Sequence, residues 1–342
     1  MITNKDINEI REFLENSNNP VFLFDDDPDG VCAYLLLKKH YGKGIGIATK
    51  GPPNIEEKYL SVVKKHNPDL IVVLDKPILD QEFIDNSPCQ IIWLDHHPLI
   101  KRNNVKYYNP RTNDLDDNRP TTYLAYSVVK TNLWIAMLGC VFDYYIPDFT
   151  KEFINEYPDL MAKTPKDPGE AKYATEFGKI INIFSFNLKG ESKDINKSMK
   201  SFEEIKTPYE IFNKESEAGI YLYKRFEKLD KEYKKLLEKA EKSLNEDKIL
   251  LFTYLSNETS FTGDLANEMS YKYSDKIIII GRRKDDRVIM SIRSKKIKIL
   301  YSIEKSLVGI NGYGGGHDYA CGASVDADDF ERFIENFRKE II

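Results

Sequence analysis

The sequence has few cysteines and few histidines for its length. Its four cysteines lie scattered in apolar segments, at Cys32, Cys89, Cys140 and Cys321. This scatter matches neither a disulfide framework nor a zinc site, and it predicts reduced thiols in a cytosolic protein. Of the five histidines, two are adjacent, His96 and His97.

Several other features are absent, and each absence excludes a class of function. No apolar run approaches the ~20 residues of a membrane-spanning helix, and residues 1–20 are too polar for a signal peptide, so no membrane partner is expected. The glycine-rich loop of ATP-binding proteins and the dinucleotide fingerprint are both missing, which leaves ATP hydrolysis and redox chemistry poorly supported. Lys and Arg number 50 against 55 Asp and Glu, a net charge of −5 that argues against a broad nucleic-acid-binding surface.

The chain does contain short apolar runs that alternate with helical patterns. With 342 residues it is long enough for two domains. In the first half, strands are predicted at residues 21–24, 44–48, 70–74 and 90–94, and helices at 7–14, 31–37, 55–66 and 78–84. Because most of these runs are apolar on both faces, they predict a mostly parallel α/β sheet flanked by helices.

Three of the predicted strands end in acidic residues. The strand at 21–24 leads into the run Asp25-Asp26-Asp27-Pro28-Asp29-Gly30, the strand at 70–74 ends at Asp75, and the strand at 90–94 ends at Asp95-His96-His97. Clustered carboxylates resist ionisation unless a cation neutralises them, and ligands gather at the carboxyl ends of parallel strands. Carboxylates with imidazoles suit a transition metal such as manganese. The first run alone is equally typical of an Asp-rich turn in which Asp25 caps the helix.

A fourth acid follows a long apolar segment. Residues 121–139 predict one long helix or a helix pair, after which the chain reaches Asp143. A buried helix that ends at this residue would bring a further carboxylate to the site. An ordinary acid at a helix end is the alternative, and spacing alone does not exclude it.

These residues resemble the DHH phosphoesterase family, named for the sequence seen here as Asp95-His96-His97. The family's four motifs occur in order, at residues 25–30, Asp75, 95–97 and Asp143. Residues 312–317, Gly-Tyr-Gly-Gly-Gly-His, are similar to the glycine-rich signature of the associated DHHA1 domain, and residues 291–294 resemble its other common element. The resemblance covers about residues 20–145 and 250–330.

The resemblance implies a centre with two Mn²⁺ or Mg²⁺ ions. The implied ligands are Asp27, Asp29, Asp75, His96 and Asp143, with Asp75 bridging the two ions. His97 and Asp95 would be catalytic, with His97 near the phosphate or behind the ligands. Many relatives have a histidine where Leu23 stands, and the Asp-x-Asp-x-Asp-Gly run resembles instead the RecJ-type branch, which makes Asp25 a candidate extra ligand.

The second half of the chain is predicted to hold a connector and a smaller α/β domain. The expected boundaries are a DHH catalytic domain at 1–190, a helical connector at 191–245 and a DHHA1 substrate-binding domain at 246–342. An apolar stripe on the helix at 219–244 indicates packing on the protein's own body, or a partner-binding coiled coil. Further strands are predicted at 249–255, 276–281 and 288–293, and helices at 262–273 and 328–341.

The second domain has the residues expected to hold an anionic substrate. Residues 272–305 contain eleven Lys or Arg against four Asp or Glu, although a solvated strand face is the ordinary explanation of such a run. Glycines let backbone N–H groups approach a phosphate closely, and cationic side chains add charge-assisted contacts. A plain glycine-rich hairpin is the alternative. The candidate substrate-binding residues are Ser291, Arg293, Gly314, Gly315, Gly316 and His317.

These features together predict a metal-dependent phosphodiesterase. Two divalent ions about 3.5–4 Å apart stabilise the attacking and leaving oxygens of a phosphoester displacement, and His97 or a nearby carboxylate would transfer protons. The expected substrates are single-stranded DNA or RNA ends, or short oligonucleotides, cut to 5′-mononucleotides, with a replication or repair protein as a further partner. The alternatives are a phosphatase or phosphodiesterase for a cyclic dinucleotide, a bisphosphate nucleotide or pyrophosphate, and a non-catalytic replication scaffold. A scaffold would be expected to lose metal ligands, and here the set is intact.

Overall fold

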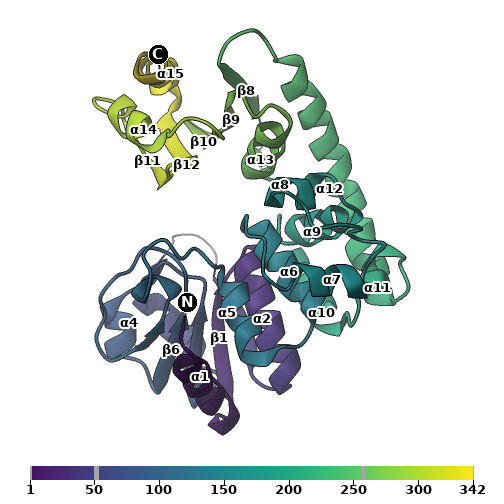
Figure 1. The fold of residues 1–342 in the computed structure, drawn as a ribbon. Helices are drawn as coiled ribbons and strands as arrows, with labels where there is room; N and C mark the ends of the chain where they lie inside the picture. Colours follow the sequence, from purple (N-terminus) through teal and green to yellow (C-terminus); the bar gives the residue numbers. More distant parts are fainter. Residues whose placement is uncertain (1, 50–53, 256–258, 342) are drawn as a thin grey trace. The chain divides into compact units, whose positions relative to one another are not determined.

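The computed structural model describes residues 2–49, 54–255 and 259–341 and contains two compact units (Figure 1). The first unit comprises Met1–Leu188 and Ser192–Lys224, and the second comprises Lys189–Glu191 and Arg225–Ile342. The long helix α12 (Glu217–Lys242) begins in the first unit and ends in the second. In the ranges that the structure describes, no helix has both the length and the apolarity needed to cross a bilayer.

The first unit is built on a five-stranded sheet in which every neighbouring pair is parallel. Its spatial order is β2 (Ile45–Thr49), β1 (Pro20–Asp25), β4 (Leu70–Leu74), β6 (Gln90–Leu94) and β7 (Lys106–Tyr108). The chain winds outward from β1 to β2 and then returns to β4 on the other side of β1. In sheets wound in this way, ligands bind at the carboxyl ends of the strands where the winding reverses.

Both faces of this sheet are buried, as the apolar runs predicted. One face places Leu23, Val73 and Trp93 in a core with the short helices that follow the strands. On the other face, Phe24 stacks on Tyr34 of α2 (Pro28–Tyr41) with ring centroids 4.5 Å apart. Helices α2 and α5 (Thr121–Val129) lie side by side (Figure 1), and α2 also packs on α6 (Leu133–Phe142). The predicted parallel α/β sheet flanked by helices is therefore confirmed.

The remaining helices of the first unit are mostly short. Two of them flank the early strands: α1 (Asn4–Asn16) and α4 (Gln81–Asp85). The middle of the chain forms the others: α7 (Thr150–Glu156), α8 (Pro168–Tyr173), α9 (Glu176–Asn187), α10 (Ser192–Glu204) and α11 (Pro208–Phe212). The segment at 121–139 is a helix pair, because Lys130 and Asn132 adopt left-handed conformations (φ 53° and 56°) that end α5 before α6 begins.

The predicted helix at 55–66 is wrong in its first part. β3 (Asn54–Ile55) pairs in parallel with β5 (Ile78–Leu79), and a 3₁₀ turn precedes the short helix α3 (Leu60–Lys64). Ile55 and Leu79 are fully buried, so pairing of these two segments buries side chains that a continuous helix would have placed on its own face. The helix predicted at 78–84 likewise begins only at Gln81, and strand β7 was not predicted.

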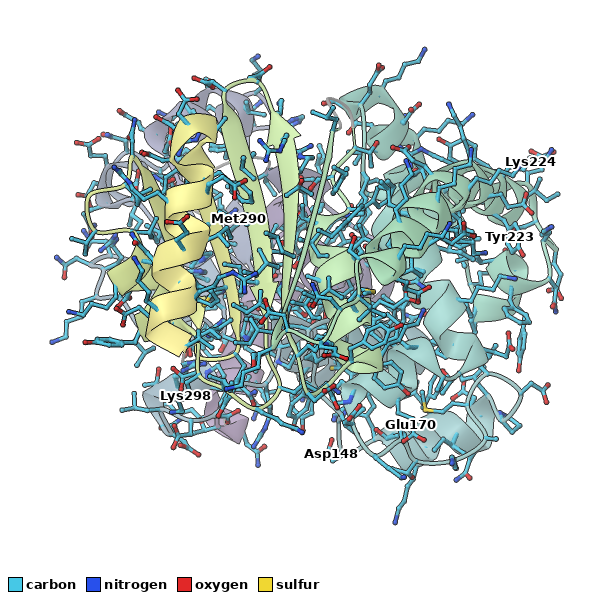
Figure 2. The ribbon with its side chains drawn as sticks, turned by 90° about the horizontal axis from the view of Figure 1, so that it is seen from above. Asp148, Glu170, Tyr223, Lys224, Met290 and Lys298 are labelled. Carbon is cyan, nitrogen blue, oxygen red and sulfur yellow. The ribbon has the colours of Figure 1, made fainter. Side chains whose placement is uncertain are left out.

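The second unit has a five-stranded sheet of its own, in the order β11-β12-β10-β9-β8. Its strands are β8 (Ile249–Leu255), β9 (Ile277–Lys284), β10 (Arg287–Arg293), β11 (Gly312–His317) and β12 (Ala320–Asp326), and its helices include α13 (Thr262–Lys272), α14 (Leu300–Ser306) and α15 (Phe330–Ile341). Met290, labelled in Figure 2, lies in a core with Phe333 and Phe337. The predicted strands at 249–255, 276–281 and 288–293 are confirmed, whereas α14 was not predicted.

Candidate metal centre

The acidic and imidazole side chains that follow β1, β4 and β6 converge at the carboxyl edge of the parallel sheet. Among the described residues, three groups have ligand atoms within 4.8 Å of one another. They are Asp25, Asp27 and Asp75; Asp75, His96 and His97; and Asp29, His96 and Asp143. Asp75 and His96 each belong to two groups, so the three groups form one continuous cluster. It contains all six metal ligands predicted from the sequence.

The spacing of the donor atoms suits ions between them. His96 Nε2 lies 3.5 Å from Asp75 Oδ1 and 3.5 Å from Asp143 Oδ2. Its distance to Asp29 Oδ2 is 4.0 Å. Because Mg²⁺ binds oxygen at about 2.0–2.1 Å, two ligand atoms of one ion lie about 3–4 Å apart. The donor set and its spacing therefore fit hard divalent cations such as Mn²⁺ or Mg²⁺.

Asp75 reaches the cluster through an unusual backbone conformation. Its φ of 58° lies in the left-handed region, which few residues other than glycine and asparagine adopt at low cost. The amide of Asp75 donates to Leu94 O at 3.0 Å, and the Thr121 hydroxyl donates to Asp75 Oδ1 at 3.1 Å. The end of β4 is thus fixed to β6 and to α5, and the carboxylate is held in place.

Asp27 and Asp29 are held by the starts of two helices. Asp27 caps α2 by accepting the amide of Gly30 at 3.0 Å. The buried Asp29 carboxylate accepts the amides of Thr121 and Thr122 at 2.9 and 2.8 Å. Free amides and the dipole at a helix start stabilise a negative charge, so α5 orients this carboxylate.

Asp95 lies behind His97 and orients its ring. This carboxylate is fully buried; it contacts His97 Nδ1 at 2.7 Å and accepts the Tyr107 hydroxyl at 3.0 Å. The Asn109 side chain donates to the same carboxylate at 3.3 Å and to His97 O at 3.0 Å. The sequence did not indicate Tyr107 or Asn109, because both depend on β7, a three-residue strand without a strong pattern.

Burial and mutual repulsion make the carboxylates resist ionisation. Burial, followed by the charges of Asp25 and Asp29, raises the pKa of Asp27 to about 7. Burial also raises the pKa values of Asp29, Asp75 and Asp143, and neighbouring aspartates raise those of Asp75 and Asp143 further. Divalent cations remove this repulsion, so the electrostatics as well as the donor set fit a metal centre.

Nothing in the sequence indicated one charged residue that lies beside the cluster. Lys76 is buried, with 1% of its surface exposed, and its Nζ lies 2.8 Å from Asp25 Oδ1. A lysine beside a predicted ligand gives no signal in the sequence, since most lysines extend into solvent.

The start of α2 leaves no room for a side chain at Gly30, and this gives a first testable prediction. A Cβ there would lie 2.6 Å from Asp25 O and 2.8 Å from Asp25 N. We expect Gly30→Ala to destabilise the first unit by about 1–3 kcal/mol, because backbone atoms must move. Urea unfolding followed by tryptophan fluorescence measures this, since both tryptophans, Trp93 and Trp134, lie in the first unit.

A glycine in open space serves as the control for this change. The nearest atom to a Cβ at Gly263 of α13 is Ser291 Oγ at 3.9 Å. Gly263 lies in the second unit, so the unfolding of Gly263→Ala is followed by far-UV circular dichroism, which reports on both units, and its midpoint should equal that of the wild type. Equal midpoints for Gly30→Ala and the wild type would contradict the packing argument.

The predicted substrate-binding residues lie in the second unit, on three adjacent strands. β12 places Gly322 between Gly315 and Ser291, and Ala320 between His317 and Arg293. The expected glycine-rich hairpin is present as β11 and β12. A Cβ at Gly315 would meet nothing within 4 Å, and the backbone here is therefore open to close approach.

Two of these residues also have structural roles. Gly316 has a φ of 139°, and a Cβ there would lie 2.5 Å from Ala320 O. Arg293 donates to Asn267 Oδ1 at 2.6 Å and to Cys321 O at 3.0 Å. Arg293 thus joins β10 to β12 and to α13.

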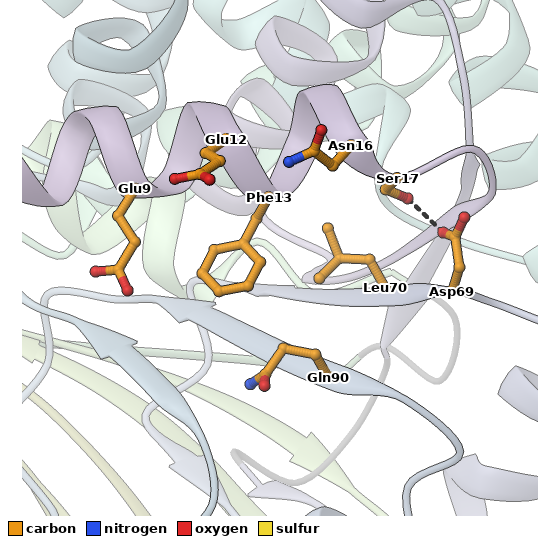
Figure 3. Close-up of a pocket in the computed structure, with 8 residues that line it drawn as sticks. All are labelled: Glu9, Glu12, Phe13, Asn16, Ser17, Asp69, Leu70 and Gln90. Carbon is orange, nitrogen blue, oxygen red and sulfur yellow. Dashed lines mark hydrogen bonds between the residues drawn. The ribbon is translucent and has the colours of Figure 1, made fainter.

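A separate pocket of about 410 Å³ lies under α1 (Figure 3). It is lined by Glu9, Glu12, Phe13, Asn16, Ser17, Asp69, Leu70 and Gln90, and the Ser17 hydroxyl donates to Asp69. Leu70 and Gln90 are the first residues of β4 and β6. This pocket is therefore at the amino edge of the sheet, away from the acid cluster.

Comparisons with known proteins agree with this architecture. Residues 248–342 match the family model of the DHHA1 domain. RecJ from Thermus thermophilus in complex with Mn²⁺ has a TM-score of 0.69 at 15% identity, over 99% of this chain and 55% of that one. This chain therefore spans about half the length of that RecJ. No curated protein matches the sequence.

Two further solved structures match this chain over nearly the whole length of both proteins. An exonuclease RecJ bound to manganese has a TM-score of 0.62 at 14% identity, over 98% of this chain and 94% of that one. The pGpG-specific phosphodiesterase PggH from Vibrio cholerae has a TM-score of 0.50 at 14% identity, over 94% and 98%.

The chain is therefore a two-unit α/β protein with a RecJ-like fold. The DHHA1 match over residues 248–342, together with the Asp-His-His sequence after β6, confirms the predicted resemblance to the DHH/DHHA1 family, and the solved structures show that the chain shares the fold of RecJ.

Proposed function

We propose that the chain is a divalent-metal-dependent phosphodiesterase that hydrolyses single-stranded nucleic-acid ends or short oligonucleotides to 5′-mononucleotides. The observation that carries this proposal is the continuous cluster of five aspartates and two histidines at the switch point of the parallel sheet. Six of them would hold two Mn²⁺ or Mg²⁺ ions: Asp25, Asp27, Asp29, Asp75, His96 and Asp143. An intact donor set disfavours a non-catalytic scaffold.

The bound ions would supply charge stabilisation for the attacking and leaving oxygens of the phosphodiester. His97 is the residue suited to move a proton. Burial lowers its pKa, but the contact with Asp95 and nearby aspartates raises it more, so the net shift is upward. Because Asp95 holds Nδ1, Nε2 is the atom from which His97 would protonate the leaving oxygen.

We propose in addition that the second unit binds part of the substrate. The support is the open backbone at Gly315 and the residues that β12 brings near it, Ser291, Arg293 and His317. Basic residues of β9 and β10 would complement the negative charge of an oligonucleotide.

The division between the two units gives a second prediction. His317→Ala should lower kcat/KM for an oligonucleotide by about 10–150-fold, which corresponds to the loss of one charge-assisted contact of about 1.5–3 kcal/mol. The affinity for Mn²⁺, measured by calorimetry, should stay near that of the wild type. Hydrolysis of bis-p-nitrophenyl phosphate should change less, since this small diester contains no nucleotide for the second unit to hold. Loss of a metal ion, or equal loss on both substrates, would contradict the division.

A substrate panel tests the proposed function. End-labelled DNA and RNA of two to twenty nucleotides, a cyclic dinucleotide, a bisphosphate nucleotide and pyrophosphate are incubated with Mn²⁺ and the products resolved. Release of 5′-mononucleotides from the linear oligomers is the expected result. Hydrolysis of the small phosphates alone would favour the alternative of a small-molecule phosphodiesterase or phosphatase. No hydrolysis of any substrate would contradict both.

A further inference from the structure

Lys76 and Asp25 form a close ion pair at the edge of the acid cluster. Lys76 Nζ lies 2.8 Å from Asp25 Oδ1; the Lys76 side chain is 2% exposed and that of Asp25 is 30% exposed. Full burial of a lysine is rare unless its charge is paired, because the cost of desolvation is large and only a close partner offsets it. The ammonium is therefore fixed at this position beside the carboxylates.

The backbone at the end of β4 aims two successive side chains at the cluster. In an extended strand, neighbouring side chains point to opposite faces. The left-handed conformation of Asp75 breaks this alternation. Asp75 Oδ1 consequently approaches His96 Nε2 to 3.5 Å while Lys76 Nζ contacts Asp25. The Trp93 indole fixes the turn by donating to Lys76 O at 2.9 Å.

The formal charges of the acid cluster and of two divalent ions indicate a role for Lys76. The cluster contains the carboxylates of Asp25, Asp27, Asp29, Asp75 and Asp143, which carry five negative charges when ionised. Two divalent ions carry four positive charges, and Lys76 supplies the fifth. His96 is neutral as a metal ligand. Asp95 is left out of this count because its carboxylate pairs with His97 and not with the ions.

We propose that Lys76 is a resident cation of the metal centre, which neutralises Asp25 and brings the centre loaded with two ions to zero net charge. This inference rests on the metal centre of the proposed function. A phosphodiester with one negative charge then enters a site that does not repel it. Because Lys76 is buried, it acts through Asp25 and the local field and does not touch the substrate; it is a positioning residue.

Calorimetric titration of the metal-free protein with Mn²⁺ tests this role through three variants. Lys76→Met should bind the weaker ion roughly tenfold tighter or more, since removing a like charge within about 4–6 Å shifts such equilibria by about 1–3 log units. Asp25→Asn should bind it correspondingly weaker. The double variant Asp25→Asn/Lys76→Met restores the charge balance and should return to within about threefold of the wild type.

Steady-state kinetics with an oligonucleotide gives a second readout. The uncompensated charge in Lys76→Met should raise KM more than it lowers kcat, and Lys76→Arg should restore most of the loss. Lys39 serves as the matched control, because its half-buried ammonium donates to the backbone oxygens of Glu203 and Ile205 and not to an acid of the cluster. Lys39→Met should leave the Mn²⁺ affinity unchanged.

The outcomes separate this inference from the function on which it rests. A wild type that binds no Mn²⁺ would overturn both. Normal binding by the wild type with unchanged affinity in Lys76→Met would overturn the inference alone. Weaker binding in both single variants, without recovery in the double variant, would also overturn it, because Asp25 would then be an indispensable ligand. If Lys76→Met does not fold, the comparison of Asp25→Asn with the double variant still decides, since only charge compensation makes the double variant the tighter binder.

Discussion

Asp75→Asn should reduce Mn²⁺-dependent hydrolysis by roughly 10²–10³-fold or more, an effect at least as large as the loss of one oriented transition-state contact. Asp75 belongs to two of the three donor groups, so its replacement removes a negative donor from both. Asparagine is the appropriate replacement because it tolerates the left-handed conformation at this position, φ 58°, whereas alanine would add backbone strain. Rates with saturating Mn²⁺ measure the effect, and circular dichroism verifies the fold.

A matched control for this variant exists in the turn between β9 and β10. Asp285 also has a left-handed backbone, with a φ of 53°, and it lies in the second unit outside the acid cluster. Asp285→Asn should hydrolyse the substrate at the wild-type rate. Activity of Asp75→Asn within tenfold of Asp285→Asn would exclude a bridging role for Asp75.

Mn²⁺ should raise the melting temperature of the first unit by roughly 5–10 °C at 100 times its dissociation constant. Binding to the native state alone stabilises by about 2.7 kcal/mol at this concentration, and 1 kcal/mol corresponds to about 2–4 °C for a domain of this size. The gain is expected because the ions remove repulsion among carboxylates whose pKa values burial and neighbouring charges raise.

Tryptophan fluorescence at pH 8 is the measurement, since Trp93 and Trp134 report on the first unit and Asp27, with a pKa of about 7, is then mostly ionised. Protons compete with metal for the same oxygens, so the shift should be smaller at pH 5.5. EDTA serves as the metal-free reference. A melting temperature that stays constant across a Mn²⁺ titration at pH 8 would count against an intrinsic site.

The sheet that positions the cluster could be predicted because its strands are short apolar runs with acids directly behind them. Residues 70–74 and 90–94 form β4 and β6, and each ends where the sequence changes from apolar to acidic. Parallel pairing then requires that the acids meet at one edge. The convergence of these acids follows from this pattern without any knowledge of side-chain geometry, whereas the choice of candidate metal ligands among them, and the addition of Asp143 from the end of α6, came from the resemblance to the DHH family.

The parts that were missed depend on contacts between segments. β3 and β5 have two residues each, too few for a periodic pattern, and only their mutual pairing makes them strands. Lys76 gives no signal because the sequence does not show which lysine is buried. The left-handed turn at Asp75 could not be predicted from the sequence either, since it is stabilised by hydrogen bonds with Leu94 and Thr121, which belong to other elements.

The most direct test of the metal centre is an anomalous difference map from crystals soaked in Mn²⁺. Two peaks about 3.5–4 Å apart are expected within the cluster. The peaks should contact Asp27, Asp29, Asp75, His96 and Asp143, with Asp25, which also pairs with Lys76, as the sixth ligand, and Asp75 should contact both. A map without peaks at this cluster, or with Mn²⁺ bound only elsewhere on the protein, would contradict the account.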